Sequence, residues 1–194
     1  LRHYGALSAY GSDIPIACAG IISKVNQVFM AICIGISQGS QPILGFNYGA
    51  EKYSRVRQTY RYSVTLCTVI ATIFFICFQF FPHQIVGIFG NGSDLYFHFA
   101  EKYLRIFMLM TFANGIQPMS ACFFTSIGKA RLGVIMSLTR QVLFLLPLIV
   151  IFPVFFGIDG VMYAGPIADT SAFVLAVVFA RRELGVMKAA EQNA

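Results

Sequence analysis

Residues 62–81 read YSVTLCTVIATIFFICFQFF and contain no Asp, Glu, Lys or Arg, and this charge-free stretch continues to Ser93. A helix that crosses the hydrocarbon core of a bilayer needs about 20 consecutive, mostly apolar residues. The stretch is a continuous apolar run, whereas the strands of a membrane barrel alternate apolar and polar residues. Because only helices and closed barrels span a bilayer, the stretch predicts a transmembrane helix.

Three further windows lack charge in the same way, namely residues 25–50, 106–128 and 141–158. The chain of 194 residues is 57% hydrophobic and only 11% charged, whereas soluble domains carry about 25% charged residues. A chain of this size cannot bury so much apolar surface in a water-soluble core. We therefore predict an all-α polytopic transmembrane helix bundle. Its predicted spans cover residues 14–36, 62–81, 103–125, 134–156 and 160–180.

The distribution of basic residues between the predicted loops indicates how the protein is oriented in the membrane. One set of loops contains nine of them: Lys52, Arg55, Arg57, Arg61, Lys129, Arg131, Arg181, Arg182 and Lys188. The opposite set contains three: Arg2, Lys102 and Arg105. The positive-inside rule places the richer side, and with it the carboxyl terminus, in the cytoplasm. We therefore expect a multi-pass protein of the plasma (inner) membrane, preceded by helices outside this sequence.

The remaining composition restricts the function. The formal net charge of +6 is explained by basic loops that contact anionic membrane lipid, so no nucleic-acid partner is expected. The sequence has no Walker A loop, no HExxH, no GxSxG and no Cys/His cluster with metal-ligand spacing, so no cofactor and no enzymatic activity are predicted. The five cysteines lie in apolar segments without a CxxC pair, which is typical of small buried side chains.

A short motif occurs twice. Residues 39–42 read Gly-Ser-Gln-Pro near the end of the first predicted span, and residues 115–118 read Gly-Ile-Gln-Pro within the third. Both spans run in the same direction, and each motif is followed by a glycine and basic residues. Internal repeats are common in transporters, although four residues can also match by chance.

The longer segments around these motifs are similar to a known family. Residues 37–50, SQGSQPILGFNYGA, resemble the end of the eighth helix in the multidrug and toxic compound extrusion (MATE) family, and most of all its small bacterial drug-exporter branch. Residues 115–131 resemble the tenth helix and the loop after it, and residues 160–169 with Arg181-Arg-Glu-Leu184 resemble the twelfth. The similarity extends over nearly the whole chain.

This resemblance implies twelve helices in two six-helix lobes and a secondary transporter that exports organic cations in exchange for H⁺ or Na⁺. Residues 1–194 would then be a partial carboxy-terminal lobe, with helices eight to twelve, and the amino-terminal lobe of the same protein would be its partner. The family's mechanism would be alternating access, in which two lobes rock around a central site. In many members the main coupling carboxylate lies in the amino-terminal lobe.

Ionisable residues inside spans are costly and are therefore candidate sites. Asp169, near the middle of the fifth predicted span, is a candidate for ion coupling or for binding a cationic substrate; the alternative is a carboxylate satisfied by a neighbouring helix. Lys24, Asn26 and Gln27 cluster in the first span, where they line a polar cavity or form a structural network. Lys24 is also a candidate partner for Asp169, since a buried lysine needs an acid.

Further candidates lie beside prolines. Gln117 and Asn114 are predicted either to contact substrate or to bond backbone groups freed at a bend. Pro42, Pro118 and Pro166 are candidate bend positions, because proline removes a helical hydrogen bond.

Two other functions remain open. A lipid-linked oligosaccharide flippase of the same superfamily needs more cations in its cavity, and an intramembrane enzyme needs a pair such as Lys24 with Asp169.

Overall fold

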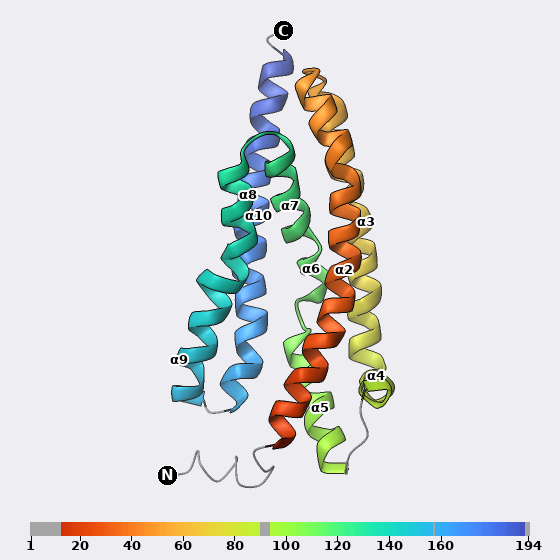
Figure 1. Ribbon diagram of the computed structural model, residues 1–194, viewed down its shortest axis with the longest axis vertical. Coiled ribbons are helices and arrows are strands. Elements are labelled where there is room, and N and C mark those ends of the chain that lie inside the picture. Colours follow the sequence, from red (N-terminus) through yellow and green to blue (C-terminus); the bar gives the residue numbers. More distant parts are fainter. Residues whose placement is uncertain (1–12, 90–93, 157, 193–194) are drawn as a thin grey trace.

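The computed structural model describes residues 13–89, 94–156 and 158–192, and every element in these ranges is a helix (Figure 1). Two long helices come first, α2 (Asp13–Gly49) and α3 (Tyr53–Phe80). Shorter helices follow: α4 (Pro82–Phe89), α5 (Asp94–Phe107), α6 (Thr111–Asn114), α7 (Ile116–Ser126) and α8 (Ala130–Leu138). The chain ends with the π-helix η1 (Thr139–Leu145), α9 (Leu146–Phe156) and α10 (Ile158–Gln192).

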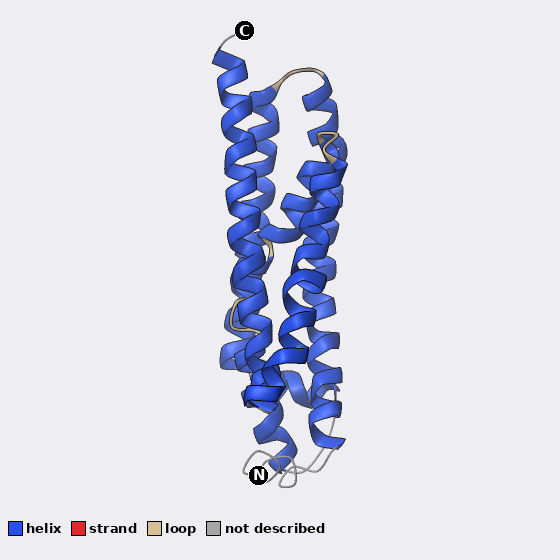
Figure 2. Ribbon diagram, turned by 90° about the vertical axis from the view of Figure 1, so that its left-hand side faces the viewer, coloured by secondary structure: helices blue, strands red, loops and turns tan. Residues whose placement is uncertain are grey.

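The prediction of an all-α membrane bundle is confirmed. Four helices are long and apolar enough to cross a membrane, and residues 96–107 and 111–126 form a bent pair that gives a fifth when it is taken as one span. Figure 2 shows these helices running along the bundle with short connections between them. The start of α3 and the end of α10 lie at the same end of the bundle (Figure 1). Most of the basic residues counted above therefore gather at that end.

The helices extend beyond several predicted boundaries. The first span was predicted to end at residue 36, but α2 continues to Gly49, and the chain reverses at Ala50–Lys52. Glu51 adopts a positive φ of 57° there, a conformation that non-glycine residues use mainly in tight turns. Likewise, α3 begins nine residues before the predicted second span. Both long helices therefore extend beyond the predicted spans.

The third span is broken before the proline that we expected to bend it. The two helical parts meet at 46° across residues 108–110, and a second interruption falls at Gly115. Pro118 is the third residue of α7, where a missing amide donor costs no helical hydrogen bond. The prediction that Pro118 makes this bend is therefore wrong. Pro42 and Pro166 lie inside continuous helices.

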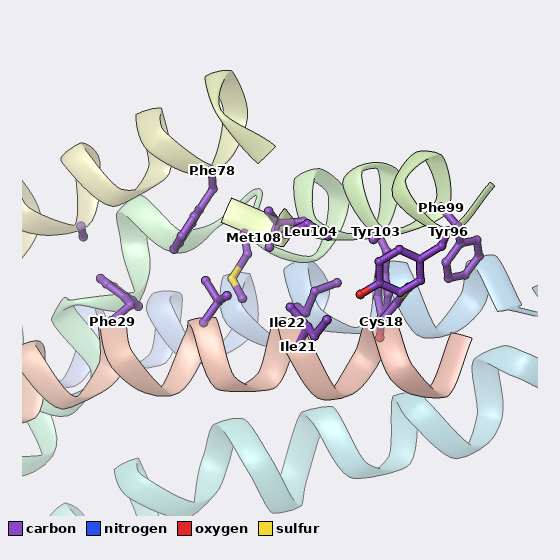
Figure 3. Close-up of a cluster of buried hydrophobic side chains, with 14 of the residues drawn as sticks. Cys18, Ile21, Ile22, Phe29, Phe78, Tyr96, Phe99, Tyr103, Leu104 and Met108 are labelled. Carbon is purple, nitrogen blue, oxygen red and sulfur yellow. The ribbon is translucent and has the colours of Figure 1, made fainter. Parts of the chain in front are cut away.

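The core of the bundle has two parts. In the first, Phe29 of α2, Phe78 of α3 and Leu104 of α5 lie buried together (Figure 3). In the second, Leu44, Tyr60 and Phe123 join α2, α3 and α7. The phenol of Tyr60 also forms a hydrogen bond of 2.9 Å with Ser120. Polar pairs of this kind hold helices together where lipid supplies no hydrophobic driving force.

Small residues let α10 approach its neighbours closely. Every fourth residue on one face of α10 is a buried alanine: Ala164, Ala168, Ala172, Ala176 and Ala180. At Gly165, an added Cβ would lie 2.7 Å from the ring of Phe107, so only glycine fits this contact. Small residues at helical spacing are typical of close contacts between membrane helices.

An ion pair ties the α7–α8 turn to α10. Lys129 Nζ lies 2.6 Å from both carboxylate oxygens of Glu183, and the glutamate side chain is only 10% exposed. We expect Glu183→Gln to lower the free energy of unfolding by about 1 kcal/mol, because Lys129 is itself partly solvated and the pair is screened. Thermal unfolding of the purified complete protein measures this loss. Glu51→Gln removes an exposed acid at a nearby turn and is the control; equal losses in both variants contradict the prediction.

Candidate transport site

The carboxylate of Asp169 lies at the centre of a buried polar network. Its Oδ1 accepts a hydrogen bond from Nε of Arg140, which also forms a salt bridge with it, and its Oδ2 accepts one from Nδ2 of Asn114 at 2.7 Å. The residues come from α10, η1 and α6 and are only 2%, 6% and 4% exposed. Both carboxylate oxygens thus have donors, which a buried charge requires.

Arg140 is the residue that the sequence analysis missed. It lies inside the predicted fourth span and was therefore left out of the loop count, yet it is the one charged residue of that span. The criterion that selected Asp169 would have selected it too. Arg140 is the second residue of the π-helix η1, and π-helical turns occur often at functional sites.

A cleft of about 400 Å³ opens beside this network, between α2, α7, α8 and η1. Its polar lining consists of Ser37, Gln38, Gln41, Gln117, Thr125, Ser137, Arg140 and Gln141, and its apolar lining includes Met30 and Ile34. Arg140 belongs to both features, since it lines the cleft and binds Asp169. A concave site that combines apolar walls with convergent polar groups is typical of a small-molecule site.

The repeated motif lies in this cleft. Gln41 of the first copy and Gln117 of the second both line it, one from α2 and one from α7. The two copies thus face one space, although 76 positions separate the glutamines in the sequence. Gln117 is buried, and its Nε2 donates to the backbone carbonyl of Met136 at 2.7 Å. The structure therefore gives Gln117 a backbone partner just before the π-helix.

The polar cluster on α2 lies elsewhere. Lys24 and Gln27 have exposed side chains, and Asn26 is partly buried, with an Oδ1 that has no hydrogen-bond partner among the described residues. The α2 wall of the cleft begins further along the helix, at Met30. The predicted pairing of Lys24 with Asp169 is wrong, because Arg140 and Asn114 occupy both carboxylate oxygens. The buried guanidinium of Arg140 provides the counter-charge instead.

This arrangement, with an ion pair at membrane depth and a polar cleft between broken or irregular helices, can be compared with known proteins. The family model described as MatE matches residues 6–157. The chain belongs to the MatE family. Since members of this family are transporters and not enzymes, the intramembrane enzyme considered above is excluded.

Individual MatE relatives agree with this assignment. The "Multidrug export protein MepA" of Staphylococcus saprophyticus is 26% identical over 186 residues, which is 94% of this chain and 40% of the relative. The protein of the same name from Staphylococcus aureus strain MSSA476 is 25% identical over 178 residues, or 92% and 37%. The chain thus spans about two fifths of the length of the curated relatives that it matches.

Solved MatE structures have the same fold. A structure of the MATE multidrug transporter DinF-BH, solved as a complex, has a TM-score of 0.81 and 34% identity, and the match covers 94% of this chain and 41% of that one. An outward-facing MATE family transporter of the MOP superfamily has a TM-score of 0.84 at 17% identity, covering 96% and 42%. The bundle of this chain therefore has the fold of the corresponding part of these MATE transporters.

Proposed function

We propose that the complete protein is a secondary active transporter that exports organic cations in exchange for H⁺ or Na⁺, and that this chain forms most of its carboxy-terminal lobe. The observation that carries the proposal is the Asp169–Arg140 pair on the wall of a polar cleft. The names of the MepA relatives support drug export. The amino-terminal lobe of the same protein would complete the central site, and membrane lipid would surround the bundle.

The proposed coupling is electrostatic. In the described state the carboxylate neutralises the guanidinium, so the cleft wall carries little net charge. When H⁺ or Na⁺ binds Asp169, the positive charge of Arg140 is no longer balanced and faces the cleft. A cationic substrate is then repelled and released, and by reciprocity a bound cationic substrate disfavours ion binding. This is the exchange that an antiporter needs, and alternating access would make it vectorial.

Orientation and ion specificity belong to the same proposal. The basic end of the bundle, with Arg57 and Arg181, lies in the cytoplasm according to the positive-inside rule, so the carboxyl terminus is cytoplasmic in the inner membrane. Pro42 and Pro166 lie in the two long helices that would bend or tilt during the transition. Lys24 and Gln27 are exposed on α2 and are available to face the partner lobe.

Efflux of ethidium from cells that express the complete protein tests the coupling. We expect Asp169→Asn to reduce proton-driven efflux by about tenfold or more, because coupling between sites is typically worth 5- to 150-fold. Asp94→Asn removes the same charge from an exposed position on α5 and is the matched control. A protonophore abolishes efflux if H⁺ is used, whereas Na⁺ dependence identifies the other ion. Full activity of a well-expressed Asp169→Asn protein overturns the role of Asp169.

One observation favours the flippase alternative. Arg140 adds a cation to the cleft lining, and guanidinium groups bind phosphate well. A flippase would bind the pyrophosphate of a lipid-linked oligosaccharide there and would leave ethidium efflux unaffected. If cells with normal expression export none of the tested organic cations, the flippase becomes the better explanation.

A further inference from the structure

We propose that the cleft between α3 and α10 at the basic end of the bundle binds the phosphate of an anionic phospholipid, and that one acyl chain of this lipid follows α3 toward the bilayer centre. This cleft is distinct from the one beside Asp169. It has a volume of about 990 Å³ and is lined by four cations, Arg57 and Arg61 of α3 and Arg181 and Lys188 of α10. No acidic residue is among the described residues that line it.

The charges of this cleft are only partly balanced. Arg57 forms a salt bridge with Glu191 through Nη2 at 2.5 Å, whereas its buried Nη1 has no hydrogen-bond partner among the described residues. A buried donor without an acceptor costs free energy. Like charges on two adjacent helices also repel one another. A phosphate between the helices would accept from the orphaned Nη1 and neutralise the neighbouring cations.

The surface next to the cleft identifies the anion as a lipid. A groove of about 390 Å³ continues along α3, lined by Val64, Thr65, Thr68, Val69, Thr72 and Ile73. These positions recur every three to four residues after Ser54, Gln58 and Arg61 of the cleft, so cleft and groove share one face of α3. From Arg61 to Ile73 the helix rises about 18 Å, close to one leaflet of a hydrocarbon core about 30 Å thick. A free phosphate would use only the cleft.

Native mass spectrometry of the complete protein tests the site, with dioleoyl phosphatidylglycerol as the probe and dioleoyl phosphatidylcholine as its zwitterionic reference. We expect the wild type to retain phosphatidylglycerol preferentially. Arg61→Gln with Arg181→Gln should weaken its binding about 25-fold, at about fivefold for each cation near a membrane surface. Arg55→Gln with Arg182→Gln is the matched control, because it removes two exposed arginines of the same helices that do not line the cleft.

Two results of this comparison overturn the proposal. Equal weakening in both double variants means that the lipid responds to general surface charge and not to a site. Equal retention of the two lipids by the wild type means that the cleft is filled by another part of the complete protein. Because all four arginines lie at exposed positions, both double variants are expected to fold.

The groove is tested separately, and this arm distinguishes lipid from free phosphate. Thr72→Trp fills the groove and should weaken phosphatidylglycerol binding at least about fivefold, the effect expected of one cation above. Leu66→Trp, at an exposed position of α3 outside the groove, should leave binding unchanged. Inorganic phosphate at equal concentration should not displace the lipid. Displacement by inorganic phosphate, or no effect of Thr72→Trp, overturns the assignment to a phospholipid.

Discussion

Replacing Arg140 by leucine is expected to lower the free energy of unfolding of the complete protein by about 3–5 kcal/mol. The change leaves the buried carboxylate of Asp169 with the single donor of Asn114, and removing one partner of a buried ion pair typically has this cost. Thermal unfolding followed with a thiol-reactive dye measures this loss of stability, because Cys18, Cys33 and Cys67 are buried in the folded bundle and react only when it unfolds.

A second variant separates the ion pair from simple packing. Arg140→Leu combined with Asp169→Leu removes both charges, and replacing a buried pair by apolar residues is often neutral. We therefore expect the double variant to recover most of the lost stability while transport remains impaired. Arg131→Leu, at an exposed position in the first turn of α8, controls for the loss of an arginine. An Arg140→Leu protein as stable as Arg131→Leu contradicts the prediction.

Gly133→Val is expected to separate α7 from α8 and to lower stability by about 1–3 kcal/mol, the usual cost of overpacking. An added Cβ at Gly133 would lie 2.3 Å from Oγ1 of Thr125 and 2.9 Å from the backbone carbonyl oxygen of Ala121. The threonine side chain can rotate, although it then loses its own bond of 2.9 Å to the same carbonyl. The backbone oxygen cannot move without the helix.

The same thermal assay measures this effect, and Gly35→Val provides the control. Gly35 is also helical, but a Cβ there would meet nothing within 4 Å. Gly133→Ala should fall between the wild type and Gly133→Val, because both add the clashing Cβ and valine adds two further methyl groups. Identical unfolding temperatures for the Gly133 and Gly35 variants would show that α8 does not depend on this contact.

Much of the fold was predictable because the physical signal is strong. A run such as residues 62–81 has few alternatives in a bilayer, where each unpaired backbone group is costly. The breaks were less predictable. The sequence suggested a bend at Pro118, yet the third span is interrupted at residues 108–110 and at Gly115. A break there depends on how neighbouring helices approach one another: a Cβ added at Gly115 would lie 3.0 Å from the Cys67 carbonyl oxygen. Single-sequence patterns do not record such an approach.

The candidate site was predicted in part. Asp169 was selected as an ionisable residue inside a span and Asn114 as a polar residue beside a proline, and the structure joins them by a hydrogen bond. Lys24 was a candidate counter-charge because that lysine is also inside a span, but its side chain on α2 is exposed. Which face of a membrane helix points inward depends on its neighbours, and the relevant neighbour, η1, is an irregular helix that periodicity does not predict.

The alanine face of α10 has a consequence for how this helix can move. Alanine side chains have no rotamers, so we expect that a shear of α10 against its neighbours would require little repacking of large side chains. Its register is then fixed by a few specific contacts, namely those of Asp169 with Arg140, of Gly165 with Phe107 and of Glu183 with Lys129. The alanine face thus leaves the position of α10 along its axis weakly defined by packing, and these three contacts define it.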